Sequence, residues 1–296
     1  MIFKETMQKQ EPFVKEAIED LFKKAADNQT HTQDILLIIE HGFYYPIFLA
    51  KPDIYETHKL SPYVIGQATI GHSERTQYEF YNWYRQSHKL DLNVFLENLR
   101  NDKNLEEAER NSIEIEKSIY LKFWESDMIL KYFHQLVNSA NGNSYDWHLT
   151  IPSESREGSK HELIRKKIRD LAKDICPKFY QLIKETYLTQ LRNAIAHSQY
   201  YFAGRRIGYN NYSEDPQAHC PLRSLSFDEW SIYFHNTLLT YNELIGNLNK
   251  WRDYYYQKTI EKGSIEIRIT KSNSEILIKE LGLRNGFKSW VWLENV

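Results

Sequence analysis

The stretch from Leu105 to Val137 constrains the fold more than any other part of the chain, because it contains neither glycine nor proline. Its apolar residues recur at helical intervals, as at Ile115, Ile119 and Phe123. Such spacing places them on one face of an amphipathic helix. We therefore predict one long helix here, which could bend near Glu125.

Two further helices are predicted after this stretch. The first runs from His161 to about Ile175 and is rich in lysine and arginine. The second starts at Pro177, which suits the first turn of a helix, and ends near Ser198. One face of this second helix carries an i, i+4 row of apolar residues, namely Phe179, Ile183, Tyr187 and Leu191.

The rest of the chain predicts one more helix and some extended structure. Ser226-Phe227-Asp228-Glu229 has the form of a capping box and is expected to open a helix that reaches about Tyr256. Tyr200 to Asn211 reads as a hairpin or an irregular loop. In the tail, Ile265, Ile267 and Ile269 alternate with polar residues, which is the period of a strand. Residues 276–278 and 290–293 are predicted to supply two more strands.

These patterns predict a mainly α fold in three parts. Residues 1–100 form an N-terminal helical and loop-rich extension, with helices expected at Glu11 to Ala26 and Tyr78 to Arg85 and loops around Gly42 to Gly66. Residues 104–258 form a helical bundle. Residues 259–296 form a small β-rich C-terminal appendix.

Composition excludes several classes of protein. The formal net charge of −2 means that any contact with nucleic acid must come from a local basic cluster. No apolar run approaches the roughly 20 residues that span a bilayer, and the N-terminus lacks the apolar core of a signal peptide. Cys176 and Cys220 make no disulfide framework, and no spacing of His and Cys indicates a metal site. We therefore expect a cytoplasmic protein without a cofactor or a metal.

The strongest functional signal closes the predicted third helix of the bundle, at Leu191-Arg192-Asn193-Ala194-Ile195-Ala196-His197. Histidine can move a proton near neutral pH because its unperturbed pKa is about 6.5. Arginine stays charged and directs two donors at phosphate oxygens. RNA carries its own nucleophile, the 2′-hydroxyl, so these two groups suffice in principle to cut it without a metal. Because residues five apart lie about 140° apart around a helix, we expect Asn193 to orient the His197 imidazole and Arg192 to curl toward the same cleft.

Each of these residues also has a simpler interpretation. An isolated histidine at the edge of an apolar face is more often a core or interface residue, and an isolated arginine is usually a surface salt-bridge former. A second pair with the same spacing, Arg156 and His161, falls in a predicted loop. The pair at Arg192 differs because it lies at the end of a helix, with Asn193 beside the arginine.

A helical bundle whose third helix ends in Arg192-Asn193-Ala194-Ile195-Ala196-His197, followed by a tyrosine-rich loop, resembles the HEPN family (higher eukaryotes and prokaryotes nucleotide-binding). The resemblance covers roughly residues 104–258. It implies a HEPN-like bundle and a metal-independent endoribonuclease that leaves 2′,3′-cyclic phosphate and 5′-hydroxyl ends. Such enzymes act as toxins or in antiphage defence. By this resemblance Arg192, His197 and Asn193 take the catalytic positions.

Further residues are assigned around this motif. Arg205, Arg206 and Tyr200 are the candidate RNA-binding residues, and Glu125 and Asp127 are candidates for an acidic partner. Some toxin members of the family carry a tyrosine two residues after the histidine. Here Gln199 occupies that position and Tyr200 follows it.

The resemblance also implies partners. Two copies of the chain would form a homodimer whose motifs face each other across a shared cleft, with RNA as the substrate and an antitoxin or sensor as a further partner. The alternative is a HEPN-like module that binds a nucleotide or a protein and performs no chemistry. A third reading is a nuclease gated by its N-terminal region or its C-terminal appendix.

Overall fold

The computed structural model describes residues 1–40, 65–66, 72–87, 89–146, 149, 151, 160–215, 220–270, 274–283 and 288–293. The chain forms two compact units, each assembled from three segments. Unit 1 comprises Met1–Asp20, Glu79–Leu130 and Ser153–Leu244, and unit 2 comprises Leu21–Tyr78, Lys131–Pro152 and Ile245–Val296. Residues 1–100 and 104–258 each contribute to both units, whereas residues 259–296 belong to unit 2, and the three-part division remains a prediction.

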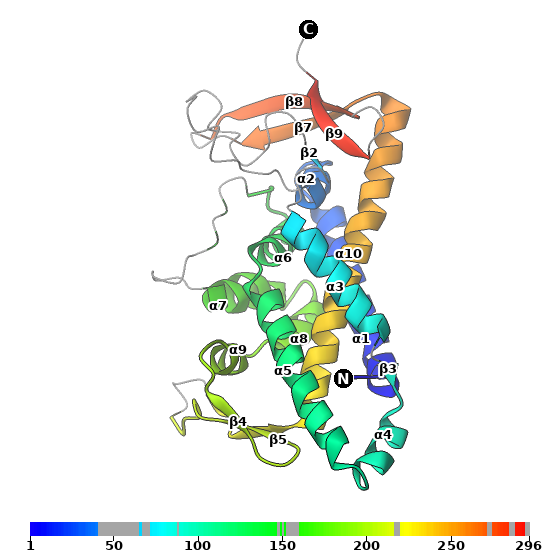
Figure 1. Cartoon of the computed structure of the whole chain (residues 1–296). Coiled ribbons are helices and arrows are strands. Elements are labelled where there is room, and N and C mark those ends of the chain that lie inside the picture. The colour runs from blue at the N-terminus through cyan, green and yellow to red at the C-terminus, as the bar shows by residue number, and fades with distance from the viewer. Residues whose placement is uncertain are drawn as a thin grey trace. The chain divides into compact units, whose positions relative to one another are not determined.

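Helices make up most of the described chain (Figure 1). The helices that lie wholly in unit 1 are α4 (Leu92–Leu99), α5 (Lys103–Glu125), α7 (Lys160–Glu162) with a π-helical segment (Leu163–Arg169) and a 3-10 turn (Asp170–Ala172), α8 (Pro177–Thr186) and α9 (Thr189–Ala196). Helix α2 (Asp34–Glu40) lies in unit 2. The helices that contribute residues to both units are α1 (Lys4–Asn28), α3 (His72–Ser87), α6 (Asp127–Ala140) and α10 (Phe227–Lys262).

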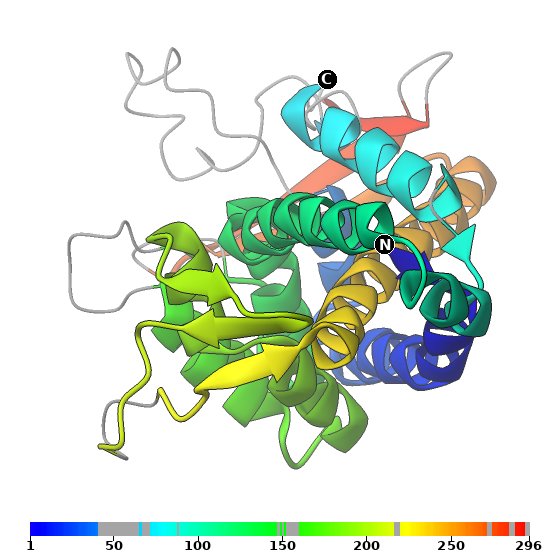
Figure 2. The same ribbon diagram turned by 60° about the horizontal axis from the view of Figure 1, so that its bottom comes forward.

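Three small sheets accompany these helices. In unit 1, β1 (Ile2–Phe3) pairs in parallel with β3 (Lys89–Leu90). A second sheet of unit 1 is antiparallel and consists of β4 (Tyr200–Phe202), β5 (Arg206–Tyr209) and β6 (Ser224–Ser226), drawn as neighbouring arrows in Figure 2. The sheet of unit 2 has the order β2-β9-β8-β7 and consists of β2 (Ile65–Gly66), β7 (Ile265–Thr270), β8 (Ile276–Leu283) and β9 (Ser289–Leu293).

The structure confirms a mainly helical protein with a small C-terminal sheet. The predicted hairpin forms, with Tyr200 opposite Tyr209 and Phe202 opposite Ile207. The capping box also forms, because Ser226 Oγ accepts the Glu229 N–H at 3.1 Å. In return, Glu229 Oε2 accepts the Ser226 N–H at 2.7 Å. The N-terminal helices lie within α1 and α3, whereas most of the predicted loop from Gly42 to Gly66 falls outside the described residues.

Two helices that were predicted as continuous are interrupted. The long helix from Leu105 divides at Ser126, next to the bend predicted near Glu125, and the extended backbone of Ser126 separates α5 from α6. The helix from Pro177 to Ser198 divides into α8 and α9, because Tyr187 and Leu188 both adopt extended conformations. A periodic apolar pattern does not reveal such a break, since the same side chains stay buried on both sides of it.

Aromatic packing in unit 1 explains where the second break lies. The hydroxyl of Tyr120 on α5 donates to the Thr186 carbonyl at 3.1 Å and accepts the Leu188 N–H at 3.3 Å. The ring of Tyr187 packs on Trp124, with 5.0 Å between ring centroids. Because these bonds use backbone groups that a continuous helix would need for itself, α5 fixes the point at which α8 ends and α9 begins.

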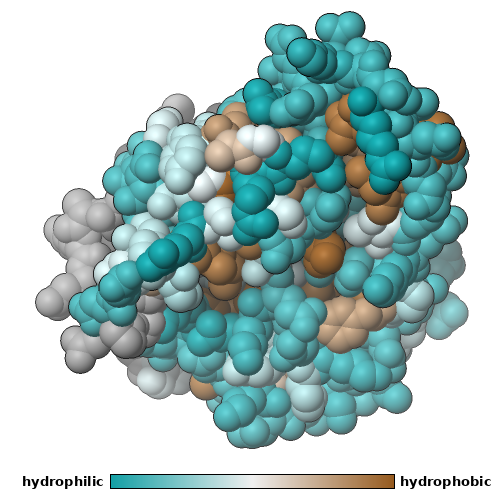
Figure 3. All heavy atoms as spheres, turned by 90° about the horizontal axis from the view of Figure 1, so that it is seen from below, coloured by the Kyte–Doolittle hydropathy of each residue, from teal (hydrophilic) through white to brown (hydrophobic). Residues whose placement is uncertain are grey.

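Surface polarity agrees with the composition. No helix among the described residues is both long and apolar enough to cross a membrane. The face seen from below is mostly hydrophilic, and its hydrophobic residues lie in small separate groups (Figure 3).

Candidate active site

The end of α9 is a Schellman motif that positions His197. The N–H of Ser198 donates to the Ile195 carbonyl at 3.3 Å, and the N–H of Gln199 donates to the Ala194 carbonyl at 2.8 Å. Ser198 has a φ of 53°, in the left-handed region that glycine usually occupies at this position of the motif. His197 is the C-cap residue and is exposed to solvent. The predicted proton-transfer group therefore lies at an ordered helix end, in contact with water.

Arg192 is held by two side chains. Its Nε donates to Oε1 of Glu125, the last residue of α5, and its Nη1 donates to Oδ1 of Asn193 at 3.0 Å. The side chains of Arg192 and Glu125 are only 16% and 24% exposed, so the ion pair is partly shielded from water. Of the two candidate acidic partners, Glu125 is thus the one that binds the motif arginine, and it joins α5 to α9.

Glu125 also binds a second cation, Lys160 of α7. The Lys160 Nζ lies 3.4 Å from Oε2 of Glu125 and donates to the Glu125 carbonyl at 2.7 Å. The same ammonium group lies 2.9 Å from Oδ1 of Asp127, the other candidate acid. We refer to Glu125, Asp127, Lys160, Arg192 and Asn193 as the motif cluster. It brings three helices and the start of a fourth to one place, so Arg192 has a defined orientation.

A second histidine lies close to this cluster. His161 follows Lys160 in the chain and is half-buried. Burial lowers the pKa of His161, the positive charges of Arg165 and Arg192 lower it further, and Glu162 opposes the shift. His161 is therefore within electrostatic reach of the motif arginine, which its predicted place in a loop did not indicate. Its sequence partner Arg156 lies outside the described residues.

Asn193 does not play the role that helix geometry suggested. It was expected to orient the His197 imidazole, but its side-chain oxygen accepts from Arg192 instead. His197 is the C-cap residue, with φ −109° and ψ 12°, and its backbone N–H donates to the Asn193 carbonyl at 3.0 Å.

Two of the predicted RNA-binding residues, Arg205 and Arg206, lie on the hairpin and already have protein partners. Arg205 donates to both carboxylate oxygens of Glu109, at 2.9 and 2.7 Å, and its Nη2 lies 3.0 Å from Asp228. Arg206 is exposed and donates twice to Ser224 Oγ, at 3.0 and 2.8 Å. Arg205 thus ties the hairpin to α5 and α10, and Arg206 is the more accessible of the two.

Tyr200 is similarly engaged. Its hydroxyl donates to Oε2 of Glu114 at 2.9 Å, and the Lys117 Nζ lies 3.2 Å from the centre of its ring. A cation so close to one face of the ring leaves a base only the other face for stacking. The neighbouring Tyr201 is 53% exposed. One side of its ring lies against Gly208, where an added Cβ would come within 2.3 Å of the Tyr201 Cζ.

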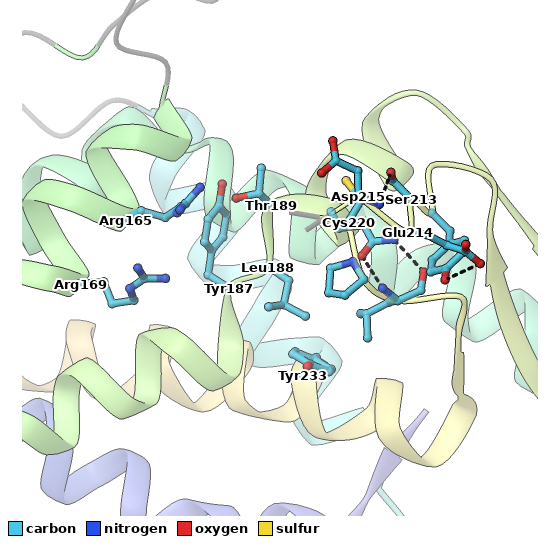
Figure 4. A pocket seen from close by; sticks show the side chains of 14 residues that line it. Arg165, Arg169, Tyr187, Leu188, Thr189, Ser213, Glu214, Asp215, Cys220 and Tyr233 are labelled. Carbon is cyan, nitrogen blue, oxygen red and sulfur yellow. Dashed lines mark hydrogen bonds between the residues drawn. The ribbon is translucent and has the colours of Figure 1, made fainter. Parts of the chain in front are cut away.

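An open pocket of about 730 Å³ lies at the opposite end of α9 from His197 (Figure 4). Arg165 and Arg169 line one side of it, and residues of the loop after β5 line the other. Tyr187 and Leu188, the two residues that interrupt the helix, lie between these sides. The Leu188 carbonyl accepts the Arg192 N–H at 3.1 Å, so the pocket begins one helical turn from the motif.

Sequence reasoning missed Arg169 and His161 as site residues, and it considered Arg165 only as part of the basic run Arg165-Lys166-Lys167. The signal was present in part, because the helix after His161 is visibly basic. Which of its cations face the site depends on the π-helical turn of Leu163–Arg169, a geometry that sequence patterns do not predict. Lys166 and Lys167, which are closest to those arginines in the sequence, are instead exposed.

The arrangement provides an exposed imidazole, an oriented guanidinium and an adjoining basic pocket. Such groups can transfer a proton and stabilise a negatively charged phosphorane. Among the described residues, no group of three or more His, Cys, Asp and Glu side chains is placed to hold a metal ion. Comparisons with protein-family models, with curated proteins and with solved structures find no match to this chain.

Proposed function

We propose that the chain is a metal-independent endoribonuclease of the HEPN type that acts as a cytoplasmic toxin or antiphage-defence effector. One observation carries the proposal most directly. Helix α9 carries the guanidinium of Arg192, which Glu125 and Asn193 hold in place, and the exposed His197 is the C-cap residue of the same helix. A buried histidine or an unrestrained arginine would not support this chemistry.

The proposed reaction needs no water and no metal. A base removes the proton of the RNA 2′-hydroxyl, the 2′-oxygen bonds to the adjacent phosphorus, and the bond from phosphorus to the 5′-oxygen breaks. An acid then supplies one proton to that 5′-oxygen, so one proton is taken and one is returned. The products are a 2′,3′-cyclic phosphate and a 5′-hydroxyl, and Arg192 would stabilise the charge that builds up on the phosphoryl oxygens.

Base and acid are two groups, and each chain contributes one motif histidine. We infer that two chains pair so that the His197 residues of both copies serve one cleft, one as base and one as acid. Mixing wild type with an equal amount of His197→Ala chains, at constant total concentration, tests this inference. With half of the chains inactive, activity should fall to about a quarter if both histidines are needed, because only pairs of wild-type chains work. A fall to about one half would show that each chain works alone.

The main test compares the cleavage of total RNA, in the presence of EDTA, by purified wild type, Arg192→Ala and His197→Ala. Wild type should cut the RNA and leave 5′-hydroxyl ends, which polynucleotide kinase can label without prior phosphatase treatment. Arg192→Lys is the matched control for loss of charge, since lysine keeps the charge but lacks the fork of donors. Equal cleavage by wild type and His197→Ala, or none by wild type, would rule out the enzyme.

A second function, a non-catalytic HEPN-like binding module, is favoured by a different observation. The motif arginine is engaged in an ion pair that holds α5 and α9 together, which is a structural role. Under this alternative, His197→Ala leaves RNA and cell growth untouched but changes the affinity of the chain for itself or for a partner. Sedimentation velocity of both proteins at matched concentrations would detect that change.

A further inference from the structure

The pocket at the start of α9 has a cationic end. Arg165 and Arg169 are both half-buried and line the same side of the pocket (Figure 4). Arg169 Nε donates to Asp170 at 2.7 Å, whereas within the described part of the chain Arg165 has no ion pair. The hydroxyls of Tyr187 and Thr189, which hydrogen-bond to each other, lie beside Arg165. A partly desolvated guanidinium next to hydroxyl donors favours an anionic group such as a phosphate.

The middle of the pocket is apolar and aromatic. Leu188 and the ring of Tyr233 line it, and Tyr233 lies at its floor in Figure 4, while Pro221 is also among the residues that line the pocket. A flat, largely apolar surface with an aromatic ring suits a nucleobase, because every base has a π face that can stack. The pocket volume of about 730 Å³ falls in the range of roughly 300–1,000 Å³ typical of small-molecule sites.

Hydrogen bonds from one buried residue fix the far wall. Gln190 of α9 donates to the Leu222 carbonyl at 2.7 Å and accepts the Leu222 N–H at 2.8 Å. The Asn211 side chain donates to the Gln190 carbonyl at 3.0 Å. Since Gln190 is 2% exposed, the wall is held from inside the protein, and a ligand would enter a preformed site at little ordering cost.

The charges also set the direction in which a ligand can bind. Glu214 and Asp215 lie on the side of the pocket away from the two arginines (Figure 4). Glu214 is exposed and pairs with Arg223 at 2.7 Å. The guanidinium groups of Arg165 and Arg169 attract a phosphate, so we expect the anionic part of a ligand to lie toward them.

We propose that this pocket binds one nucleotide of the RNA next to the cleavage site, with its phosphate at Arg165 and Arg169 and its base over Leu188 and Tyr233. This inference rests on the proposed ribonuclease function. The pocket and His197 occupy opposite ends of α9, which is about 12 Å long at 1.5 Å per residue. The pocket therefore determines how the strand lies across the motif and does not take part in the bond breaking.

Binding is tested separately from cleavage with a fluorescent single-stranded 2′-O-methyl oligonucleotide, which has no free 2′-hydroxyl and cannot be cut. The full chain is titrated and the anisotropy gives Kd. The double variant Arg165→Gln/Arg169→Gln should raise Kd about tenfold or more, because hydrogen bonds to charged groups are lost. The matched control is Lys166→Gln/Lys167→Gln, which removes the same charge from exposed positions of the same segment, and it should raise Kd less than threefold. Tyr233→Leu should weaken binding, whereas Tyr233→Phe should not.

Several results would overturn the proposal. An equal loss of affinity in the arginine and lysine double variants would mean non-specific electrostatic binding. A free nucleoside monophosphate that saturates the pocket without displacing the oligonucleotide would assign the pocket to a free nucleotide instead. If the arginine double variant does not fold, the single variant Arg165→Gln is tested in its place, because it removes no described ion pair.

The outcome also separates this inference from the proposed function. His197→Ala should bind the oligonucleotide as tightly as wild type. If the arginine double variant loses affinity while no form of the chain cuts RNA, the pocket assignment stands and the nuclease fails. If the arginine double variant binds and cuts RNA like wild type, the pocket assignment fails alone.

Discussion

His235 and His197 are both histidines of unit 1, and their surroundings differ completely. His235 lies within α10 and is fully buried, and its Nε2 accepts the Phe3 N–H at 3.3 Å. Burial, together with the nearby amino group of Met1, lowers the pKa of His235 to about 3. His197 caps the end of α9 and is open to solvent. The same side chain is thus a buried, neutral acceptor in one place and is exposed to solvent in the other.

Arg205 and Arg192 also differ in their binding partners. Arg205 binds two carboxylates, one of which, Glu109, is 3% exposed. Arg192 binds Glu125, which it shares with Lys160. Two acids thus bind the Arg205 guanidinium, and two cations, Arg192 and Lys160, bind the Glu125 carboxylate. We therefore expect Arg205 and His235 to maintain the fold and, under the proposed function, Arg192 and His197 to act on RNA.

The largest expected effect is the loss of activity when His197, the exposed histidine, is replaced. His197→Ala should lower kcat/KM on a fluorogenic RNA by about 10²–10⁴-fold, the usual contribution of a general acid or base. Its free energy of unfolding should stay within about 0.5 kcal/mol of wild type, because the residue is exposed. Urea unfolding and initial rates on the same samples measure both. A large loss of stability in this variant would place His197 with His235 as a structural residue.

The second effect concerns Arg205. Arg205→Ala leaves the buried Glu109 without its bidentate partner, and we expect a loss of about 3 kcal/mol of stability. The cleavage rate per folded molecule should remain that of wild type. A specific loss of RNA affinity at full folding would instead support the sequence-based assignment of Arg205 to RNA binding.

The third effect is a pH dependence that belongs to His235. Its folded pKa is about 3, whereas the unfolded chain has the ordinary value of about 6.5. Below pH 6.5 the unfolded chain therefore binds more protons, so stability is complete above that pH and falls as the pH decreases toward 3. Wild type should lose roughly 2 kcal/mol between pH 7 and pH 5 from this group. Comparing the free energy of unfolding of wild type and His235→Asn over the same pH range isolates the contribution of His235. The same pH dependence in both proteins would contradict the buried, neutral state of His235.

The smallest expected effect concerns Ser198, the residue that follows His197. Ser198 holds a left-handed conformation that costs a non-glycine residue about 1–2 kcal/mol. Ser198→Gly should therefore raise stability by up to about 1 kcal/mol, after the greater flexibility of glycine in the unfolded chain is counted. Ser198→Val should lower stability and displace His197, which would also lower the cleavage rate. Thermal unfolding and RNA cleavage rates of the Ser198→Gly and Ser198→Val variants would show whether turn geometry and activity vary together.

Much of the fold was predictable because local signals were strong. The capping box at Ser226, the hairpin from Tyr200 and the alternating isoleucines after Ile265 all predicted the elements that form. The break at Ser126 lies next to Glu125, where a bend was predicted. The break at Tyr187 was not predicted, because bonds from the Tyr120 hydroxyl, a group distant in sequence, determine its position.

Only those features of the site that lie close together in the sequence were predictable. The spacing of Arg192 and His197 is a property of the sequence, and so is the exposed turn that follows. The pairing of Arg192 with Glu125 joins residues that are 67 positions apart in the chain. The charges of Arg165 and Arg192 both act on His161, and Arg165 lies in a π-helical segment. Only the folded arrangement reveals these neighbours.

Helix α9 is eight residues long, whereas a helix shorter than about 12–15 residues is barely stable by itself in water. An excised peptide covering the motif would therefore be a disordered coil, without any fixed distance between guanidinium and imidazole. Antibodies or inhibitors directed at this segment would have to recognise it as a surface of the intact protein. Proteolytic fragments that separate it from α5 should be harmless to RNA.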